Sequence, residues 1–411
     1  PTAAMAGAVD LFAWSQTEGR DWQKEYMDGT AQYTNLNATL QGGDVRTRML
    51  LSTGYNRQTT VAQGDQYNQR ASVRLNVDHN SLDKRFGATA TVTYSYSESD
   101  MARTDFAQYW NLAPNRPLYN ANGGLNWSSM VNPEASLLQR YIGKSNSFIS
   151  NLNLHYKLST GLELRLNSGF NRTSTNQNAR IPAISQFPAP QNPITTNNAN
   201  FGIIDNQFYS VEPQLNYNRK LSKGDLNLLL GATFQNTAHI SSSIRGERYI
   251  NPQLLGAIPG ATSYVLTGAD TKYKYNSVFA RATYNWEQKY IINGIIRRDG
   301  SSRFGADYSF GNFGSIGAAW LFTNESLFKD RKSILSFGKL KANWGVTGND
   351  LISDYLYLSL FRPGSVYQGQ TTLMPTNPSN PKIRWETTQK LDVGLDLGFF
   401  KQRVTFTADY Y

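Results

Sequence analysis

Residues 86–97 read FGATATVTYSYS, and this stretch decides how the rest of the chain is interpreted. Every second side chain is apolar: Phe86, Ala88, Ala90, Val92, Tyr94 and Tyr96. The side chains between them are small and mostly polar: Gly87, Thr89, Thr91, Thr93, Ser95 and Ser97. Successive side chains in a strand point to opposite faces, so the pattern predicts a strand with one apolar and one polar face. Aromatic residues end the apolar face and aliphatic residues fill its middle, which is typical of a strand that crosses a bilayer.

We therefore expect the six apolar side chains of this strand to face lipid. Thr89, Thr91 and Thr93 should then face a wet interior. In the other strands the charged residues occupy every second position, so that they lie on one face of the strand. Near the middle of a bilayer a charge on the lipid face costs several kcal/mol, roughly 2–4 for Lys or Arg. On this argument four further side chains face the interior: Arg70, Arg74, Lys390 and Asp392.

Similar alternation recurs along the chain and predicts about fourteen strands. They cover residues 32–40, 45–55, 67–79, 86–97, 148–158, 162–171, 208–219, 226–235, 273–286, 290–298, 313–322, 337–347, 383–399 and 404 onward. The predicted fold is all-β, an antiparallel transmembrane barrel. A soluble β-sandwich is the alternative for any single strand, since it too has one buried face.

The connections between these strands alternate in length. Short ones lie at 42–44, 80–85, 159–161, 221–225, 287–289 and 401–402, with a medium, helix-like turn at 323–336. Long ones lie at about 57–66, 98–146, 172–206, 237–272, 299–312 and 348–381. Transmembrane barrels have short periplasmic turns and long extracellular loops. A sandwich has no reason to sort its loops in this way, so the alternation favours the barrel.

The composition agrees with long strands and argues against a helical membrane protein and a nucleic-acid-binding protein. Of 411 residues, 39% are hydrophobic, only 17% are charged and 13% are aromatic, and there is no cysteine. No apolar run approaches the roughly 18 residues of a transmembrane helix. The net charge is +10, but Lys and Arg are scattered singly rather than clustered, so we expect no nucleic-acid partner.

The sequence shows no pattern of a catalytic or metal site. The three histidines, His79, His155 and His239, are far apart and lack metal-ligand spacing. No glycine-rich phosphate loop or nucleophile elbow appears. We therefore expect no metal, no cofactor and no enzymatic activity.

Several longer motifs carry a resemblance to a known family. They lie at 21–23 (DWQ), 40–43 (LQGG), 297–305 (RRDGSSRFG), 340–350 (LKANWGVTGND), 384–388 (RWETT), 394–400 (GLDLGFF) and 405–411 (TFTADYY). In this order and spacing they resemble the SusC/RagA family of TonB-dependent outer-membrane transporters of the Bacteroidetes. The resemblance implies an integral protein of the bacterial outer membrane with 22 strands and an N-terminal plug.

The same resemblance implies active import of large nutrients, either oligosaccharides or peptides. It implies two protein partners, TonB and a SusD-like surface lipoprotein that caps the barrel, besides outer-membrane lipid. We expect residues 1–411 to be part of one barrel domain, with 1–31 an extracellular loop and 32–411 the strands. The plug, with its TonB box, and the C-terminal strands would lie outside this chain. A passive porin or structural barrel is the alternative function, and an outer-membrane hydrolase is a third.

The long connections are where substrate or lid contacts are expected. Aromatic rings stack on sugars and fill peptide pockets, and Arg binds carboxylates. The candidates are Tyr109, Trp110, Arg116, Tyr119, Trp127, Asp299 and Arg303. Alternatively, the aromatic residues pack the loop on itself or against a lipoprotein, and residues 299–304 form a polar turn anchored by an Arg303 ion pair. The Pro-rich run 181–193 predicts a stiff, extended loop segment.

Overall fold

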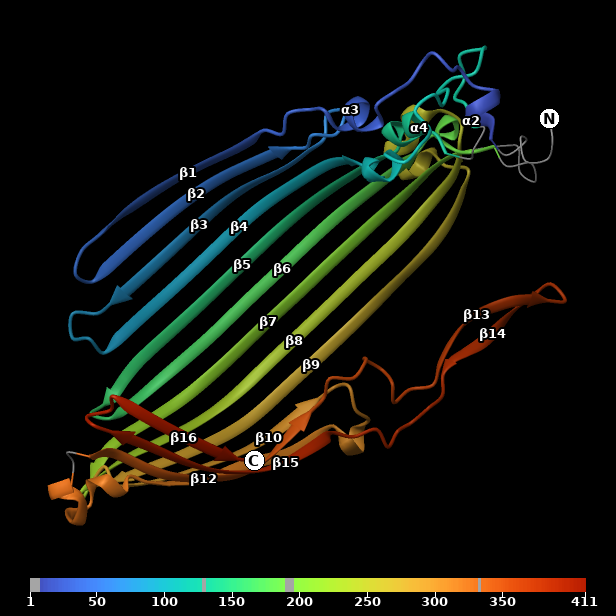
Figure 1. The fold of residues 1–411 in the computed structure, drawn as a ribbon. Helices are drawn as coiled ribbons and strands as arrows, with labels where there is room; N and C mark the ends of the chain where they lie inside the picture. The colour runs from blue at the N-terminus through green and yellow to red at the C-terminus, as the bar shows by residue number, and fades with distance from the viewer. Residues whose placement is uncertain (1–7, 128–130, 189–195, 332–333) are drawn as a thin grey trace.

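The structure is a computed structural model that describes residues 8–127, 131–188, 196–331 and 334–411. Fourteen strands form one antiparallel sheet (Figure 1): β1 (Tyr33–Gly43), β2 (Thr47–Thr59), β3 (Tyr67–Asn80), β4 (Phe86–Ala102), β5 (Arg140–Ser159), β6 (Leu162–Ile181), β7 (Asn197–Leu221), β8 (Gly224–Tyr249), β9 (Ser263–Trp286), β10 (Tyr290–Ser301), β11 (Phe310–Trp320), β12 (Leu335–Asn349), β15 (Glu386–Phe399) and β16 (Val404–Tyr410). The predicted number of sheet strands is confirmed.

Sheet order follows chain order throughout, with one insertion. β12 pairs with β15 because β13 (Leu360–Tyr367) and β14 (Gln370–Asn377) form a separate hairpin between them. This hairpin lies in the predicted 348–381 loop and was not predicted. Within the described residues, β1 pairs with β2 alone and β16 with β15 alone, so this part of the barrel wall is open at both edges. Among those residues no helix is long and apolar enough to cross a membrane.

Five strands are far longer than predicted. β5 and β6 contain 20 residues each, and β7, β8 and β9 contain 25, 26 and 24, so the predicted loops at 172–206 and 237–272 are wrong over most of their length. At about 3.4 Å per residue, β8 is about 85 Å long, whereas the apolar band of a barrel is only about 25 Å tall. Beyond that band both faces of a strand are wet, so backbone pairing continues while the hydrophobic alternation that predicts strands disappears.

The connections are sorted by end, as predicted (Figure 1). One end carries the short turns at 44–46, 81–85, 160–161, 222–223, 287–289 and 400–403, with the longer 321–334 turn. The other end carries the long connections at 60–66, 103–139, 182–196, 250–262, 302–309 and 350–385. The predicted helix-like turn contains the 3₁₀-helices η6 (Phe322–Asn324) and η7 (Ser326–Arg331). Of the Pro-rich run, residues 189–193 lie outside the described part.

Strand register separates the predicted sets onto two faces. On one face β3 and β4 pair Arg74 with Thr93, Asn76 with Thr91 and Asp78 with Thr89. On the other they pair Val73 with Tyr94, Leu75 with Val92 and Val77 with Ala90. We call these the polar face and the apolar face. Arg70 lies on the polar face opposite Ser97, and further along the sheet Lys390 and Asp392 share it, opposite Gly345 and Asn343.

Exposed hydrophobic residues gather on the apolar face well beyond β4. They include Leu228, Leu230, Val278, Ile292, Ile296, Ile316, Leu340, Trp344, Leu391 and Val393. A contiguous exposed apolar surface of this extent marks a protein or membrane contact. It supports the prediction that this face meets lipid and the polar face lines the interior.

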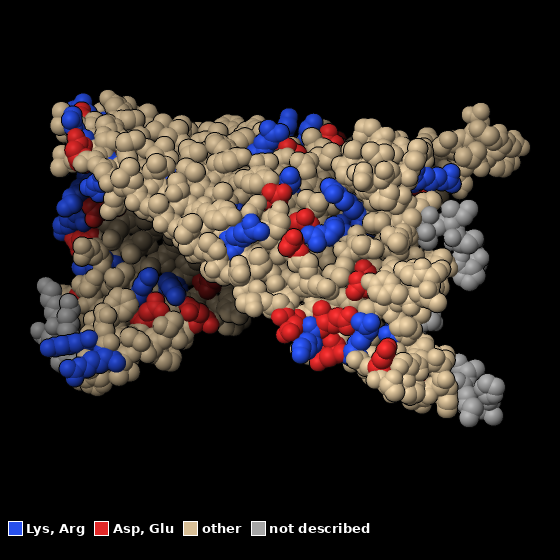
Figure 2. Space-filling model, turned by 90° about the horizontal axis from the view of Figure 1, so that it is seen from above, with Lys and Arg blue, Asp and Glu red and all other residues tan. Residues whose placement is uncertain are grey.

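The apolar face ends at a row of charges toward the long connections. On β4 it runs from Phe86 to Tyr96, which at about 3.4 Å per residue and a tilt of about 40° rises about 26 Å. Ion pairs follow on the same face, between Glu98 and Lys144 (3.3 Å), Asp100 and Arg140 (2.8 Å), and Arg172 and Asp205 (2.8 Å). Figure 2 shows charged side chains at the end with the short turns and over the middle of the molecule, with uncharged surface between them. The strands therefore continue well beyond the expected bilayer.

The two faces of β4 should respond differently to one added charge. We expect Ala90→Arg to lower the free energy of unfolding by about 2–4 kcal/mol, because the guanidinium would enter lipid. Thr91→Arg, the matched control, should cost about 1 kcal/mol, the loss of the Thr91 hydroxyl's bond to Asn76 (3.0 Å). Urea unfolding of the protein in lipid vesicles measures both. Equal costs would contradict the facing of this strand.

Candidate extracellular binding site

The end with the long connections carries a packed cap built from distant parts of the chain. It contains α2 (Val9–Phe12), α3 (Trp22–Met27), η1 (Phe106–Tyr109) and α4 (Pro133–Leu138), which lie together in Figure 1. Each of the last three begins at a polar residue whose side chain accepts a backbone N–H two or three residues on: Asp21, Asp105 and Asn132. Such N-caps satisfy donors that the first helical turn leaves free. The segment at 1–31, expected to be an extracellular loop, therefore contributes the helices α2 and α3 to this cap.

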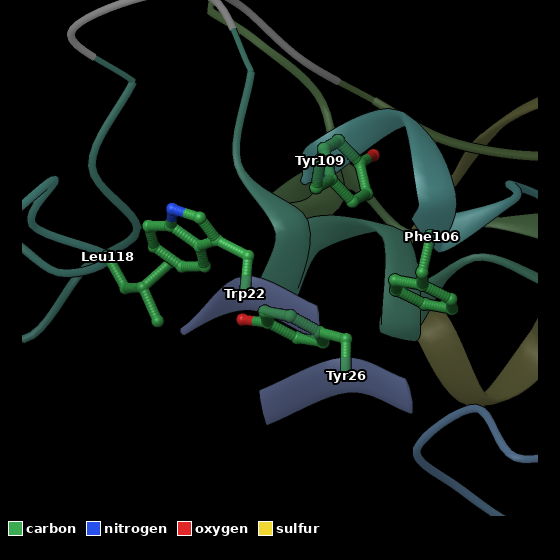
Figure 3. Close-up of a cluster of buried hydrophobic side chains, with 5 residues drawn as sticks. All are labelled: Trp22, Tyr26, Phe106, Tyr109 and Leu118. Atoms are coloured by element: carbon green, nitrogen blue, oxygen red, sulfur yellow. The ribbon is translucent and has the colours of Figure 1, made fainter. Parts of the chain in front are cut away.

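Aromatic stacking holds the cap together. Trp22 and Tyr26 on α3 pack with Phe106, Tyr109 and Leu118 from the 103–139 connection (Figure 3). The rings of Tyr26 and Phe106 stack with centroids 5.6 Å apart. Burying side chains of this size contributes about 1.5–3 kcal/mol each. The contact ties the segment before β1 to the connection after β4.

Polar atoms inside the cap are paired. The Trp22 indole N–H donates to the carbonyl of Leu112 (3.0 Å), and the Tyr26 hydroxyl donates to Glu134 Oε1 (2.6 Å). Burial, together with the adjacent Glu134 carboxylate, raises the pKa of the Tyr26 hydroxyl well above its ordinary value. Tyr26 therefore stays protonated and keeps donating to Glu134 at any physiological pH.

Two predicted contact residues are interior parts of this cap. Tyr109 is buried and its hydroxyl bonds to Ser136 Oγ (2.5 Å). Arg116 is also buried, and its guanidinium donates to the carbonyl of Val131. This burial argues against direct substrate contact by either residue and supports the alternative that they pack the loop on itself.

The other three aromatic candidates lie nearer the surface. Trp110 and Tyr119 are half exposed, and Trp127 is partly buried with its ring 6.0 Å from that of Phe187. Exposed rings beside a rigid cap offer flat surfaces on which a sugar ring or an apolar peptide side chain can stack. These three residues remain candidate contacts.

The 299–304 motif forms a latch rather than an open contact surface. Asp299 is buried and pairs with Arg297 (2.7 Å), whose guanidinium also reaches the hydroxyl of Tyr275 (2.5 Å). Arg303 pairs with Asp354 (3.0 Å) and donates to the carbonyl of Asp350 (3.0 Å). This arrangement supports the alternative of an anchored polar turn.

The latch holds the base of the 350–385 connection. The Arg303 guanidinium lies 4.2 Å from the ring centroid of Tyr273, whose hydroxyl donates to Asp350 Oδ2 (2.7 Å). The Tyr355 hydroxyl accepts the backbone N–H of Lys272 (2.9 Å). Sequence reasoning missed Tyr273, Asp350 and Asp354 because their partners are about 50 to 80 residues away along the chain.

The β13–β14 hairpin did have a sequence signal. Its turn is Gln368-Gly369, and both residues have positive φ (49° and 80°). Glycine at the second position of a two-residue turn is typical of tight hairpins. The hairpin projects away from the sheet (Figure 1) and exposes Phe361, Val366, Tyr367 and Leu373.

The arrangement of this end suits binding. In the described ranges, no group of three or more His, Cys, Asp or Glu residues could hold a metal ion. The carboxylates discussed above are engaged in ion pairs or hydrogen bonds. What this end presents is packed loops, exposed aromatic rings and one projecting hairpin.

Removing the latch should loosen the 350–357 segment without unfolding the sheet. Arg303→Ala loses one ion pair, one carbonyl bond and one ring contact, which together stabilise the segment by about 1.5–3 kcal/mol. We expect amide hydrogen exchange at 350–357 to become about 10- to 100-fold faster, and an intermediate rate for Arg303→Lys, which keeps the charge but not the planar fork. Arg362→Ala is the control, since Arg362 contacts Met374 on the hairpin itself. Unchanged exchange in Arg303→Ala would show that the latch does not hold the segment.

Comparison with known proteins places these features in a family. A family model described as TonB dependent receptor-like, β-barrel matches residues 108–411. TonB-dependent receptor P39 of Formosa agariphila is 28% identical over 393 residues, 92% of this chain and 36% of that protein. TonB-dependent receptor SusC of Bacteroides thetaiotaomicron is 25% identical over 433 residues, 96% and 42% of the two chains.

A solved structure of the RagAB peptide transporter superposes on 97% of this chain and 46% of that chain, with a TM-score of 0.76 and 20% identity. The chain spans 36–42% of the length of the curated relatives it matches. The match to the family model covers most of the chain. The chain therefore belongs to the TonB dependent receptor-like β-barrel family.

Proposed function

We propose that the receptor containing this chain actively imports large nutrients, oligosaccharides or peptides, across the bacterial outer membrane in a TonB-dependent manner. The observation that carries the proposal is the family match over residues 108–411. The barrel itself is an integral outer-membrane protein, like others of its family. The peptide class comes from the RagAB peptide transporter, whose fold this chain shares, and the oligosaccharide class comes from the resemblance to the SusC/RagA family described above.

The number of strands in the sheet supports transport through a wide, plugged barrel. Fourteen strands already lie in one sheet that is open at both edges. Barrels of 16–18 strands enclose water-filled channels, and 22-stranded transporters have a plugged lumen. In our proposal the plug and its TonB box lie in the part of the protein outside this chain, residues 1–31 form an extracellular loop, and the polar face lines the lumen.

A SusD-like surface lipoprotein is the proposed lid. The cap, the latch and the projecting hairpin all lie at the long-connection end, where such a partner would dock. The exposed apolar residues of the β13–β14 hairpin lack partners in the described part of the chain, and an isolated hairpin is only marginally stable in water. We propose no catalytic role for any residue.

Uptake and swelling measurements separate active import from passive diffusion. We expect a deletion strain to lose growth on one defined oligosaccharide or peptide, and the complemented strain to lose that growth again when TonB is deleted. The intact receptor in liposomes should show little swelling, because the plug closes the lumen. High swelling together with growth that does not require TonB would instead indicate the passive porin.

The same growth assay tests the exposed aromatic residues. Trp110→Ala should weaken uptake about tenfold at limiting nutrient, the loss of a ring contact worth about 1–1.5 kcal/mol. Trp344→Ala is the matched control, because Trp344 lies on the apolar face and is as exposed (48%) as Trp110 (47%). Equal uptake by the two variants would remove Trp110 from the contact surface.

A further inference from the structure

The 321–334 turn between β11 and β12 is much longer than the described turns beside it, and its position is fixed. The backbone N–H of Leu321 donates to the carbonyl of Lys289 (2.7 Å), and the Asn324 side chain donates to that of Gln288 (2.7 Å). The buried Thr323 hydroxyl accepts the N–H of Gly338 (3.0 Å). The turn is therefore held against the 287–289 turn and the start of β12.

A chain of aromatic rings runs from the apolar face into this turn. Tyr290 pairs in register with both Trp286 and Trp320, and the centroids of their rings are 5.7 and 6.5 Å from that of Tyr290. From Trp320 the contacts continue to Phe322 (5.6 Å) and then to Phe328 in η7 (5.6 Å). The apolar surface of the sheet therefore does not stop at the strand ends but extends into the turn.

The polar tips of these rings meet at one carboxylate. Glu325 accepts the Tyr290 hydroxyl (2.7 Å) and the Trp320 indole N–H (3.3 Å), and it lies 3.4 Å from the Lys289 ammonium. Rings with an apolar body and a hydrogen-bonded tip favour the boundary between hydrocarbon and water. The level of Glu325 therefore corresponds to the polar side of that boundary.

Beyond Glu325 the turn exposes two large aliphatic side chains. Leu327 is 84% exposed and Ile334 is 61% exposed. Leu327 directly precedes Phe328, the last ring of this chain, in η7. An exposed apolar side chain beside rings that extend the apolar face is most simply covered by the medium that covers that face.

We propose that residues 321–328 of this turn form an interfacial anchor, with Leu327 and Phe328 inserted into the phospholipid headgroup boundary of the periplasmic leaflet. Short helical segments with an apolar side bind such boundaries about 5–10 Å deep. The anchor fixes the depth of this sector of the barrel in the membrane. It rests on the apolar face meeting lipid, which the experiment tests separately.

The absence of cysteine from this chain allows a direct test with single-cysteine variants. Leu327→Cys carries an environment-sensitive fluorophore in the intact receptor, reconstituted in phosphatidylcholine vesicles with shallow or deep nitroxide-labelled lipids. Ile296→Cys (70% exposed, apolar face) is the lipid control, and Leu351→Cys (81% exposed, extracellular connection) is the water control. All three sites are exposed in the structure, so differences between them report the surroundings rather than packing.

We expect the shallow nitroxide-labelled lipid to quench the fluorescence of the Leu327 label more than the deep one does. The Ile296 label should be quenched by the deep quencher, and the Leu351 label by neither. A Leu327 label that behaves like Leu351 would overturn the anchor. A Leu327 label that is shielded from water but unquenched would also overturn it, because a protein would then cover the turn.

An unquenched Ile296 label would show that the apolar face does not meet lipid, and the anchor would fail with that placement.

Discussion

Backbone hydrogen bonding in a medium without water is the constraint on which this structure depends. Within a bilayer each N–H and C=O must find a partner in the protein, so strands must pair on both sides. β2 to β12 and β15 do so, in unbroken chain order apart from the inserted hairpin. Antiparallel pairing of chain neighbours allows strands to be joined by tight turns. The 222–223 connection between β7 and β8 shows how short such a turn becomes.

Above the bilayer the same pairing serves a different purpose. β7, β8 and β9 continue far past the row of ion pairs that ends the apolar face. In the proposed orientation, these strand extensions carry the 250–262 connection between β8 and β9 beyond the membrane. The cap is tied by stacking between Tyr26 and Phe106, and the 350–385 connection by Arg303. Recognition elements on such a support can vary while the wall stays the same.

Sequence periodicity predicted the fold wherever one face of a strand meets an apolar medium. β4 was predicted at 86–97 and runs from Phe86 to Ala102, because Tyr96 is the last apolar residue before Glu98. β8 was underestimated because apolar residues become sparse beyond Gln235, where Ala238, Ile240 and Ile244 lie among polar residues. The candidate binding residues were harder to predict from the sequence than the strands of the sheet. Arg116 and Tyr109 are of residue types that bind ligands, yet both are buried. Tyr109 packs in one core with Trp22 and Tyr26, more than 80 residues away, and Arg116 donates to the carbonyl of Val131.

The central claim is that one face of β4 lies in lipid from Phe86 to Tyr96 and in water from Glu98 onward. Nitroxide labels at successive single cysteines from 86 to 102, in vesicles, measure collision with oxygen, which concentrates in lipid, and with a water-soluble nickel complex. The account predicts a period of two up to Tyr96, with Ala88, Ala90 and Val92 in contact with oxygen and Thr89, Thr91 and Thr93 with nickel. At Glu98 and Asp100 nickel contact should replace oxygen contact. Oxygen contact without alternation, or alternation that continues to Ala102, would contradict it.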